Sequence, residues 1–250
     1  MPLLRTLIRS LLYLPYNFRK LTGTGPFNGQ IARFVDPARL TGANPLKAAL
    51  WRHRVKQQHE SSCSVASIAA CLNAIRELQS PDAPLISQAE LLKRVRTANW
   101  PQRMSDRGDN GKRGLPLFLL GRIVEDSLAA FGLAASAVDT VLTSRDPEKA
   151  PRLRQELLRR LQRFETGGDL LLIAHFDQGS FLPTLNIPHI SPVGGFDDAS
   201  GRVIVLDVDP DLALPYAIEL DTFYQGLSCN FLHVFKPFGY GSGGYVAITL

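Results

Sequence analysis

Residues 57–78 read QQHESSCSVASIAACLNAIREL, and the interpretation of the whole chain starts from this stretch. From Cys63 onward, apolar residues recur with a helical period, and four alanines lie between them. Because small side chains let neighbouring elements pack closely, we predict a buried central helix. A cysteine in its first turn lies at the positive end of the helix dipole, which favours the thiolate. Cys63 is therefore a candidate nucleophile, although a cysteine taken alone is more often an inert buried residue.

Two β-rich runs later in the chain supply a histidine and two aspartates. Residues 187–196 (IPHISPVGGF) and 202–208 (RVIVLDV) flank the sequence DDASG, which is typical of a turn. A hairpin closed over this turn places His189 opposite residues 207–209, where a carboxylate could orient the imidazole. Asp207 and Asp209 both fit. We favour Asp207, because a carboxylate within an apolar strand needs a partner.

The order of the patterns predicts an α+β fold. A Gly-Gly pair at 167–168 separates helical patterns from short β-rich runs, so we expect a helical part packed on a C-terminal antiparallel sheet. A segment at 1–40 with a Gly/Pro-rich stretch precedes one catalytic domain at 41–250. The expected helices are 63–78, 87–96 (opened by a Ser87/Glu90 capping box), 115–131 and 147–165, and the expected strands are 170–176, 187–196, 202–208, 230–235 and 245–249.

Composition excludes several classes of protein. Apolar residues make up 45% of the chain and charged residues 20%, as in a globular protein. The net charge is +5, but the basic residues are scattered, so we expect no nucleic-acid binding. Cys63 and Cys71 on one helix would lie ~12 Å apart, too far for a disulfide. The sequence has neither a CxxC nor an HExxH motif, so we predict no metal site in the protein.

Residues 1–20 leave several interpretations open. The segment is apolar, is interrupted by Arg5 and Arg9, and is too short to span a bilayer. It fits a helix packed on the domain, a basic helix lying on a membrane, or a poorly cleaved signal sequence. We expect a cytoplasmic protein, with peripheral membrane association or export as the alternatives, and a homodimer as one candidate assembly.

These motifs resemble the phytochelatin synthase family. The nucleophile helix of that family is similar to Gln57–Cys63, Val65–Ile68 and Leu72–Ile75. Its histidine motif resembles His189–Phe196 and its aspartate motif Leu206–Val208, with a similar separation of 18 positions between histidine and aspartate. The resemblance covers roughly residues 45 to 240 and is specific at these motifs.

The resemblance implies a papain-like fold and an activity on glutathione. Cys63 would attack the Cys–Gly bond, glycine would leave, and a γ-glutamylcysteinyl thioester would form. His189 would be the base and Asp207 its orienter. Gln57, six positions before the cysteine, would be the oxyanion donor. The resemblance implies no tightly bound cofactor, and cadmium or zinc would act through the thiolates of the substrate.

The chain departs from the family pattern around the substrate. The motifs imply substrate contacts at Ser62, Ser64 and Gly194, but the two serines replace an aromatic residue and a glycine. Asp209 and Pro210 stand where the family carries an Ala-Arg pair, so a guanidinium that would hold a carboxylate is lost. The chain also lacks the cysteine-rich extension of the plant enzymes. We therefore expect a short bacterial type that mainly hydrolyses glutathione, with dipeptidyl transfer weak or absent.

Two alternatives remain. A papain-like peptidase of the bacteriocin-leader type also has an upstream glutamine, a cysteine followed by small residues, a histidine and an Asp-Pro pair. A binding module docked to a membrane by residues 1–20 would need no nucleophile. The joint presence of Cys63, His189 and Asp207 argues against the second alternative, because packing alone requires none of them.

Overall fold

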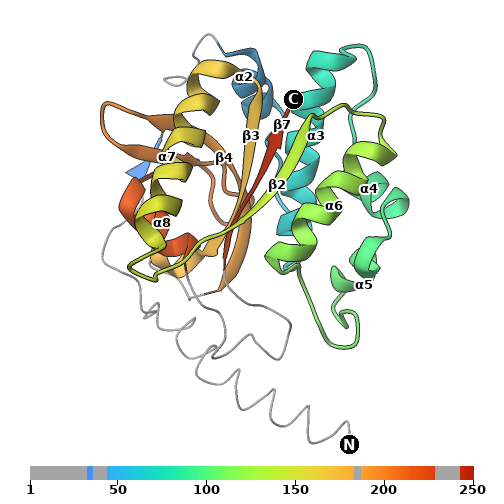
Figure 1. The fold of residues 1–250 in the computed structure, drawn as a ribbon. Coiled ribbons are helices and arrows are strands. Elements are labelled where there is room, and N and C mark those ends of the chain that lie inside the picture. Colours follow the sequence, from blue (N-terminus) through green and yellow to red (C-terminus); the bar gives the residue numbers. More distant parts are fainter. Residues whose placement is uncertain (1–32, 36–43, 183–186, 229–242) are drawn as a thin grey trace, which may run out of the picture.

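The computed structural model describes residues 33–35, 44–182, 187–228 and 243–250, and Figure 1 shows a mixed arrangement of helices and sheet. The prediction of an α+β fold is confirmed. Segments 1–20, 22–30 and 230–235 lie outside the described residues. The helices are α2 (Pro45–Arg52), α3 (Cys63–Gln79), α4 (Gln88–Arg94), α5 (Trp100–Arg103), α6 (Leu117–Ala130), α7 (Ala150–Gly167) and α8 (Leu220–Leu227), with short 3₁₀ turns at Thr97–Asn99 and Gln178–Ser180.

The strands that the structure describes form one seven-stranded sheet in the order β1-β6-β5-β4-β3-β7-β2. Every neighbouring pair is antiparallel. The last strand along the chain, β7, is therefore inserted between two earlier ones. The strands are β1 (Arg33–Phe34), β2 (Ala137–Leu142), β3 (Leu170–Asp177), β4 (Pro188–Asp197), β5 (Arg202–Val205), β6 (Tyr216–Glu219) and β7 (Gly244–Thr249).

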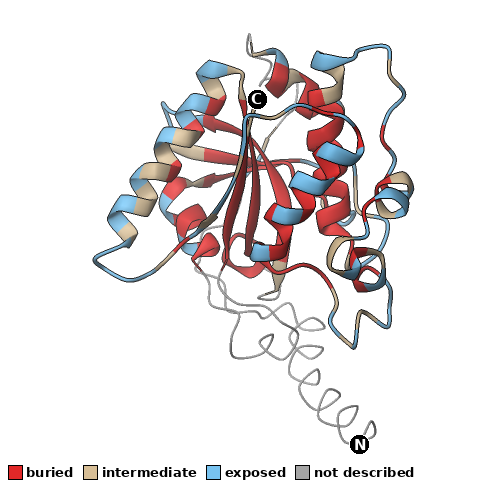
Figure 2. Ribbon diagram, turned by 45° about the vertical axis from the view of Figure 1, so that its right-hand side comes forward, coloured by how far each residue is buried: buried red, intermediate tan, exposed pale blue. Residues whose placement is uncertain are grey.

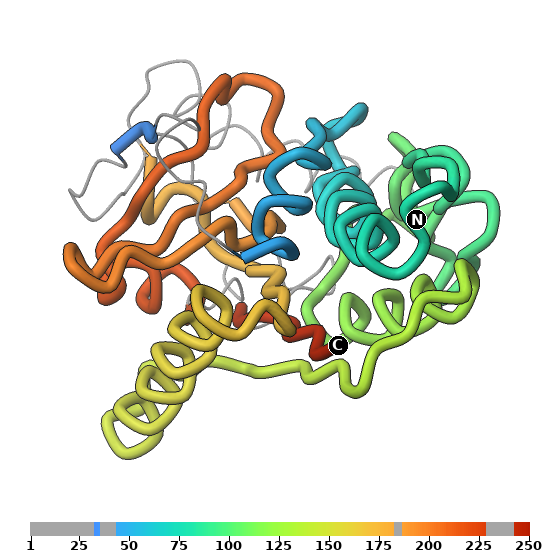
Figure 3. Tube along the Cα trace, turned by 90° about the horizontal axis from the view of Figure 1, so that it is seen from above, coloured from blue at the N-terminus to red at the C-terminus, as the bar shows by residue number. Residues whose placement is uncertain are grey.

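Helices cover both faces of the centre of the sheet. Strand β3 is buried along its whole length, which requires cover on each face (Figure 2). Helix α7 packs against β3 and β4, and α3 packs against β4 (Figure 3). All residues of α3 from Cys63 to Ile75 are buried, so the prediction of a buried central helix is confirmed. This packing brings the first residue of α3 toward the histidine strand β4.

The local predictions for α4 and the hairpin are largely confirmed. Ser87 caps α4 by accepting a hydrogen bond from the Glu90 N–H at 3.1 Å. The helix ends at Arg94, two residues before the predicted end, because the Val95 backbone is extended. The turn after Asp197 joins β4 to β5 as an antiparallel hairpin.

Three features differ from the sequence-based expectation. The strand predicted over 202–208 ends at Val205, and a bulge between Val193 and Gly195 shifts the register of β4 against β5. The simple division into helices and then strands is wrong, since β2 precedes α7 and α8 follows β6. The patterns also do not predict α2, α5, α8, β1, β2 and β6. Among the described residues, no helix is both long and apolar enough to cross a membrane.

Candidate active site

Cys63 is the first residue of α3, and its backbone position is set by the turn that precedes it. The Ser62 carbonyl accepts the first hydrogen bonds of the helix from Val65 and Ala66. The Ser62 side chain does not cap the helix. Its hydroxyl accepts from the His59 N–H and donates to the His59 carbonyl, both at 2.9 Å, which closes the turn. Cys63 is only 9% exposed, so it is closely surrounded by other residues.

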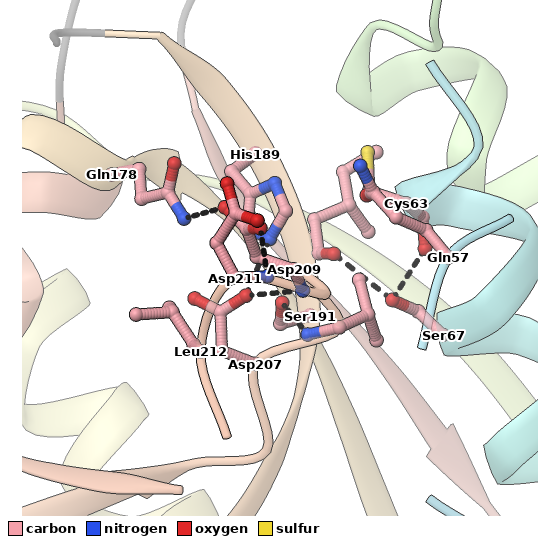
Figure 4. Close-up of polar contacts among 12 residues, drawn as sticks. Gln57, Cys63, Ser67, Gln178, His189, Ser191, Asp207, Asp209, Asp211 and Leu212 are labelled. Atoms are coloured by element: carbon pink, nitrogen blue, oxygen red, sulfur yellow. Dashed lines mark hydrogen bonds and ion pairs between the residues drawn. The ribbon is translucent and has the colours of Figure 1, made fainter. Parts of the chain in front are cut away.

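One serine joins the nucleophile helix to the histidine strand. The hydroxyl of Ser67, one turn after Cys63, lies 2.8 Å from the Cys63 carbonyl and 3.0 Å from the Ile190 carbonyl. Ile190 is the residue after His189, and Ser67 is fully buried. This contact fixes the helix against β4 at the level of the site (Figure 4).

His189 lies near the start of β4 and faces a carboxylate. Its Nε2 atom lies 2.7 Å from Asp207 Oδ1. Figure 4 labels both residues among the polar contacts of the site. Phe176 on β3 contacts the imidazole edge-on, with ring centroids 5.5 Å apart. Burial would lower the pKa of His189, but the charge and hydrogen bond of Asp207, followed by contacts with the Cys63 thiol, raise it well above 6.5. Since Nε2 is held by Asp207, Nδ1 is the ring nitrogen left to exchange a proton with sulfur.

Asp207 receives hydrogen bonds from three directions. His189 and the Asp209 N–H, at 2.9 Å, both approach Oδ1, while the Tyr216 hydroxyl donates to Oδ2 at 2.6 Å. Burial would raise the pKa of Asp207, but His189, Tyr216 and the Asp209 N–H together hold it at about 2. The carboxylate therefore stays ionised, and it can hold the imidazole in one tautomer and stabilise its protonated form.

The carboxylate of Asp209 has hydrogen-bond partners other than His189. Its Oδ2 accepts a hydrogen bond from Gln178 Nε2 at 2.9 Å, and its Oδ1 accepts from the Asp211 N–H at 3.0 Å. Of the two aspartates that the hairpin brings close to His189, Asp207 thus makes the side-chain contact and Asp209 contributes its backbone N–H.

Lys56 holds the segment that carries Asp207. Its ammonium donates to the Asp207 carbonyl at 2.6 Å and to the Leu212 carbonyl at 2.5 Å. Burial lowers the pKa of Lys56, and the nearby Asp207 and Asp209 oppose that shift. The next residue, Gln57, donates its backbone N–H to the Val208 carbonyl at 2.8 Å. The residues that precede Cys63 in the chain are therefore hydrogen-bonded to the segment that carries Asp207, which we call the aspartate segment.

The remaining predicted residues lie around this centre with other contacts. The Gln57 Nε2 atom makes a long hydrogen bond of 3.4 Å to the Glu60 carbonyl. Ser64 is fully buried and accepts from the indole of Trp100 at 3.2 Å. The Gly194 carbonyl accepts from the Trp51 indole at 2.7 Å. The oxyanion role of Gln57 and the substrate contacts of Ser62, Ser64 and Gly194 stay predictions.

Sequence patterns do not assign a role to three neighbours of the site. Tyr216, Ser67 and Lys56 are each placed by tertiary contacts. Tyr216 lies in no motif, whereas Ser67 lies within the Val65–Ile68 part of the helix motif and Lys56 directly precedes Gln57.

The part of the chain that the structure describes holds no cluster of three or more metal-ligating side chains. Cys71 is a free, fully buried cysteine, and burial raises the pKa of its thiol. Cys229 lies outside the described residues.

The comparisons with known proteins point to one family. No curated protein matches the chain significantly. The family model described as phytochelatin synthase matches residues 38–230, which include the nucleophile helix, the histidine strand and the aspartate segment. The mixed fold with its antiparallel sheet is consistent with the papain-like fold of that family. The chain therefore belongs to the phytochelatin synthase family.

Proposed function

We propose that this chain cleaves glutathione at the Cys–Gly bond through a thioester on Cys63 and mainly hydrolyses that thioester. The family acts on glutathione by transferring or hydrolysing its γ-glutamylcysteine unit. The observation that carries the assignment to these residues is the contact of His189 with both Asp207 and Cys63 at the start of a buried helix.

The proposed first step forms the thioester and releases glycine. The Cys63 thiolate, whose proton has passed to His189 Nδ1, attacks the carbonyl carbon between cysteine and glycine of the substrate. The tetrahedral intermediate collapses as the C–N bond breaks, and His189 gives its proton to the amine of the departing glycine. His189 then takes a proton from water, whose oxygen attacks the thioester, and γ-glutamylcysteine leaves as Cys63 regains its proton.

Two amides would stabilise the negative oxygen. The N–H groups of the first helical turn lack partners within the helix, so the Cys63 N–H can point at the oxygen. Gln57 would supply the second donor. Its 3.4 Å bond to the Glu60 carbonyl is long and weak, and its Oε1 atom has no hydrogen-bond partner among the described residues. A small rotation of the amide would exchange that weak bond for the oxyanion.

The preference for water over a second glutathione rests on the aspartate segment. Asp209 holds its carboxylate beside the site by bonds to Gln178 and to the Asp211 N–H, and the next residue, Pro210, stands where the family pattern has an arginine. A carboxylate there would repel the carboxylates of an acceptor glutathione, whereas water carries no charge.

Purified protein incubated with glutathione tests this proposal. Mass spectrometry should detect glycine and γ-glutamylcysteine, with Cys63→Ala inactive and Cys71→Ala, which changes the buried cysteine on the same helix, active. Parallel reactions with cadmium or zinc test whether metal thiolates of the substrate accelerate turnover.

Each outcome has a definite meaning. Longer γ-glutamylcysteine oligomers would overturn the preference for hydrolysis. No turnover by a protein whose Cys63 still reacts with iodoacetamide would overturn the glutathione assignment, and cleavage of a Gly-Gly leader peptide would then identify a peptidase.

A further inference from the structure

Tyr216 reaches the site from outside the hairpin that carries His189 and Asp207. It is the first residue of β6, it is fully buried, and its hydroxyl lies 2.6 Å from Asp207 Oδ2. The other carboxylate oxygen, Oδ1, accepts from His189 and from the Asp209 N–H. Each carboxylate oxygen thus has its own hydrogen-bond donors. By donating to Oδ2, the Tyr216 side chain fixes the rotation of the carboxylate group about the Cβ–Cγ bond of Asp207.

The protonation state of Tyr216 lets its hydroxyl act as a permanent hydrogen-bond donor. Burial, followed by the negative charge and hydrogen bond of Asp207, raises the pKa of the Tyr216 hydroxyl well above 10. The hydroxyl therefore stays protonated at every pH at which the reaction could run. A hydrogen bond to an ionised partner is stronger than one between neutral groups, so this contact holds Asp207 firmly.

An apolar path also joins Tyr216 to His189. The Tyr216 ring meets Phe181 edge-on at 6.4 Å, and Phe181 stacks on Phe176 at 4.8 Å. Phe176 contacts the His189 ring at 5.5 Å. The Tyr216 ring is therefore anchored by Phe181, which stacks on the Phe176 ring that contacts the imidazole. The Tyr216 hydroxyl is anchored by the carboxylate that faces the same imidazole.

We propose that Tyr216 is a positioning residue, which holds the Asp207 carboxylate so that Oδ1 faces His189 and the imidazole stays aligned with Cys63. The turnover measurement below rests on the proposed glutathione activity. The alkylation measurement does not, because iodoacetamide reports the reactivity of Cys63 directly.

The experiment compares two tyrosine substitutions in the full chain. Tyr216→Phe removes only the hydroxyl. Tyr245→Phe is the matched control, because Tyr245 is also buried in the sheet and its hydroxyl has no hydrogen-bond partner within the described ranges. Alkylation of Cys63 at neutral pH should slow about tenfold in Tyr216→Phe and stay within twofold of wild type in Tyr245→Phe.

The steady-state constants and the pH profile of alkylation are two measurements that a loss of packing alone would not change in the same way. With glutathione, Tyr216→Phe should lower kcat about tenfold while KM stays within twofold, since Tyr216 acts through Asp207. Losing a donor to the ionised carboxylate raises the pKa of Asp207, so the acid limb of the alkylation profile should move to higher pH. Replacement of Tyr216 by p-aminophenylalanine, which keeps a donor at the same place, should restore the rate.

Equal effects of the two substitutions, or a wild-type rate and pH profile in Tyr216→Phe, would overturn the proposal. If Tyr216→Phe does not fold, the p-aminophenylalanine variant tests the proposal. A folded but slow enzyme would then show that a hydrogen-bond donor at position 216 is not sufficient, which would overturn the positioning role. If wild type fails to turn over glutathione but the alkylation rates differ as expected, the proposed function fails and the positioning role stands.

Discussion

The two halves of the site are held in different ways. The nucleophile half is the start of α3, where the proposed nucleophile, Cys63, is placed by main-chain helix bonds and by the packing of small buried residues. The base half is the pair of the proposed base, His189, and Asp207, which is placed by a network of hydrogen bonds to side chains. Packing tolerates the loss of one polar atom, whereas a buried polar network is sensitive to each member. We therefore expect the base half to respond far more strongly to single substitutions and to pH.

The largest effect should come from His189→Ala. Without the imidazole, no group takes the Cys63 proton or protonates the leaving amine, so kcat should fall about a thousandfold. His53→Ala is a matched control, because His53 also has a carboxylate partner, Glu77 at 2.6 Å. Glycine release is the measurement. Equal losses in the two variants would show that neither histidine is the base.

The second prediction concerns pH and the free energy of unfolding. Asp207 has a folded pKa of about 2 against an ordinary 3.8, so its contribution is present above about pH 4 and lost as pH falls toward 2. His189 has a pKa raised above 6.5, so its contribution is full below pH 6.5 and lost as pH rises through the folded value. The pair should stabilise the fold most between about pH 4 and 6.5.

Denaturant unfolding of wild type and Asp207→Asn across this range checks that expectation. The difference between the two proteins should reach on the order of 2 kcal/mol near pH 5 and shrink at both ends. A difference that does not vary with pH would mean that Asp207 acts through packing rather than charge.

A smaller effect is expected where the bulge in β4 meets the aspartate segment. A Cβ at Gly194 would lie 2.5 Å from Leu206 Cγ, so Gly194→Ala must shift the residue that precedes Asp207. We expect a loss of about 1 to 2 kcal/mol in stability and a several-fold fall in kcat. A Cβ at Gly195 would lie 2.9 Å from Glu165 Oε1, 3.1 Å from Ile204 Cδ1 and 3.2 Å from Lys47 Nζ, all of them end atoms of side chains, so Gly195→Ala should do less. A rise in KM alone would instead favour direct substrate contact at Gly194.

The smallest effect should come from the nucleophile half. Ser67→Ala removes the hydroxyl that joins the Cys63 and Ile190 carbonyls, at a cost of about 1 kcal/mol in stability. Because packing still holds α3, alkylation of Cys63 should change less than threefold. Ser127→Ala, which removes a buried hydroxyl bonded to the Ile123 carbonyl in α6, is the control for stability. A tenfold slower alkylation of Cys63 in Ser67→Ala would show that the nucleophile half is as sensitive to a single substitution as the base half.

Sequence patterns predicted the parts of this site that depend on local order. The helix at Cys63 has a clear period, and the turn after Asp197 closes the hairpin that pairs His189 with Asp207. The bulge at Val193–Gly195 was not predictable, because two glycines in a strand allow a bulge without requiring one. Tyr216 was missed because its role depends on which strand lies beside β5.

Two physical causes explain why the patterns missed β2, β6 and α8. Strand β2 lies at the edge of the sheet, and its residues are exposed or only partly buried, so it lacks the alternation of a half-buried strand. Strand β6 and helix α8 are short and directly joined, which blurs the periods of both.

The position of β7 has a consequence for when the sheet that carries His189 is completed. This strand follows the other described strands in the sequence, yet it lies between β3 and β2 and pairs with both. While the chain is being synthesised, β3 must wait with one edge unpaired until Gly244–Thr249 emerges. Such long-range pairings form slowly. The sheet that carries His189 is therefore completed only after Gly244–Thr249 has been made, long after α3 with Cys63.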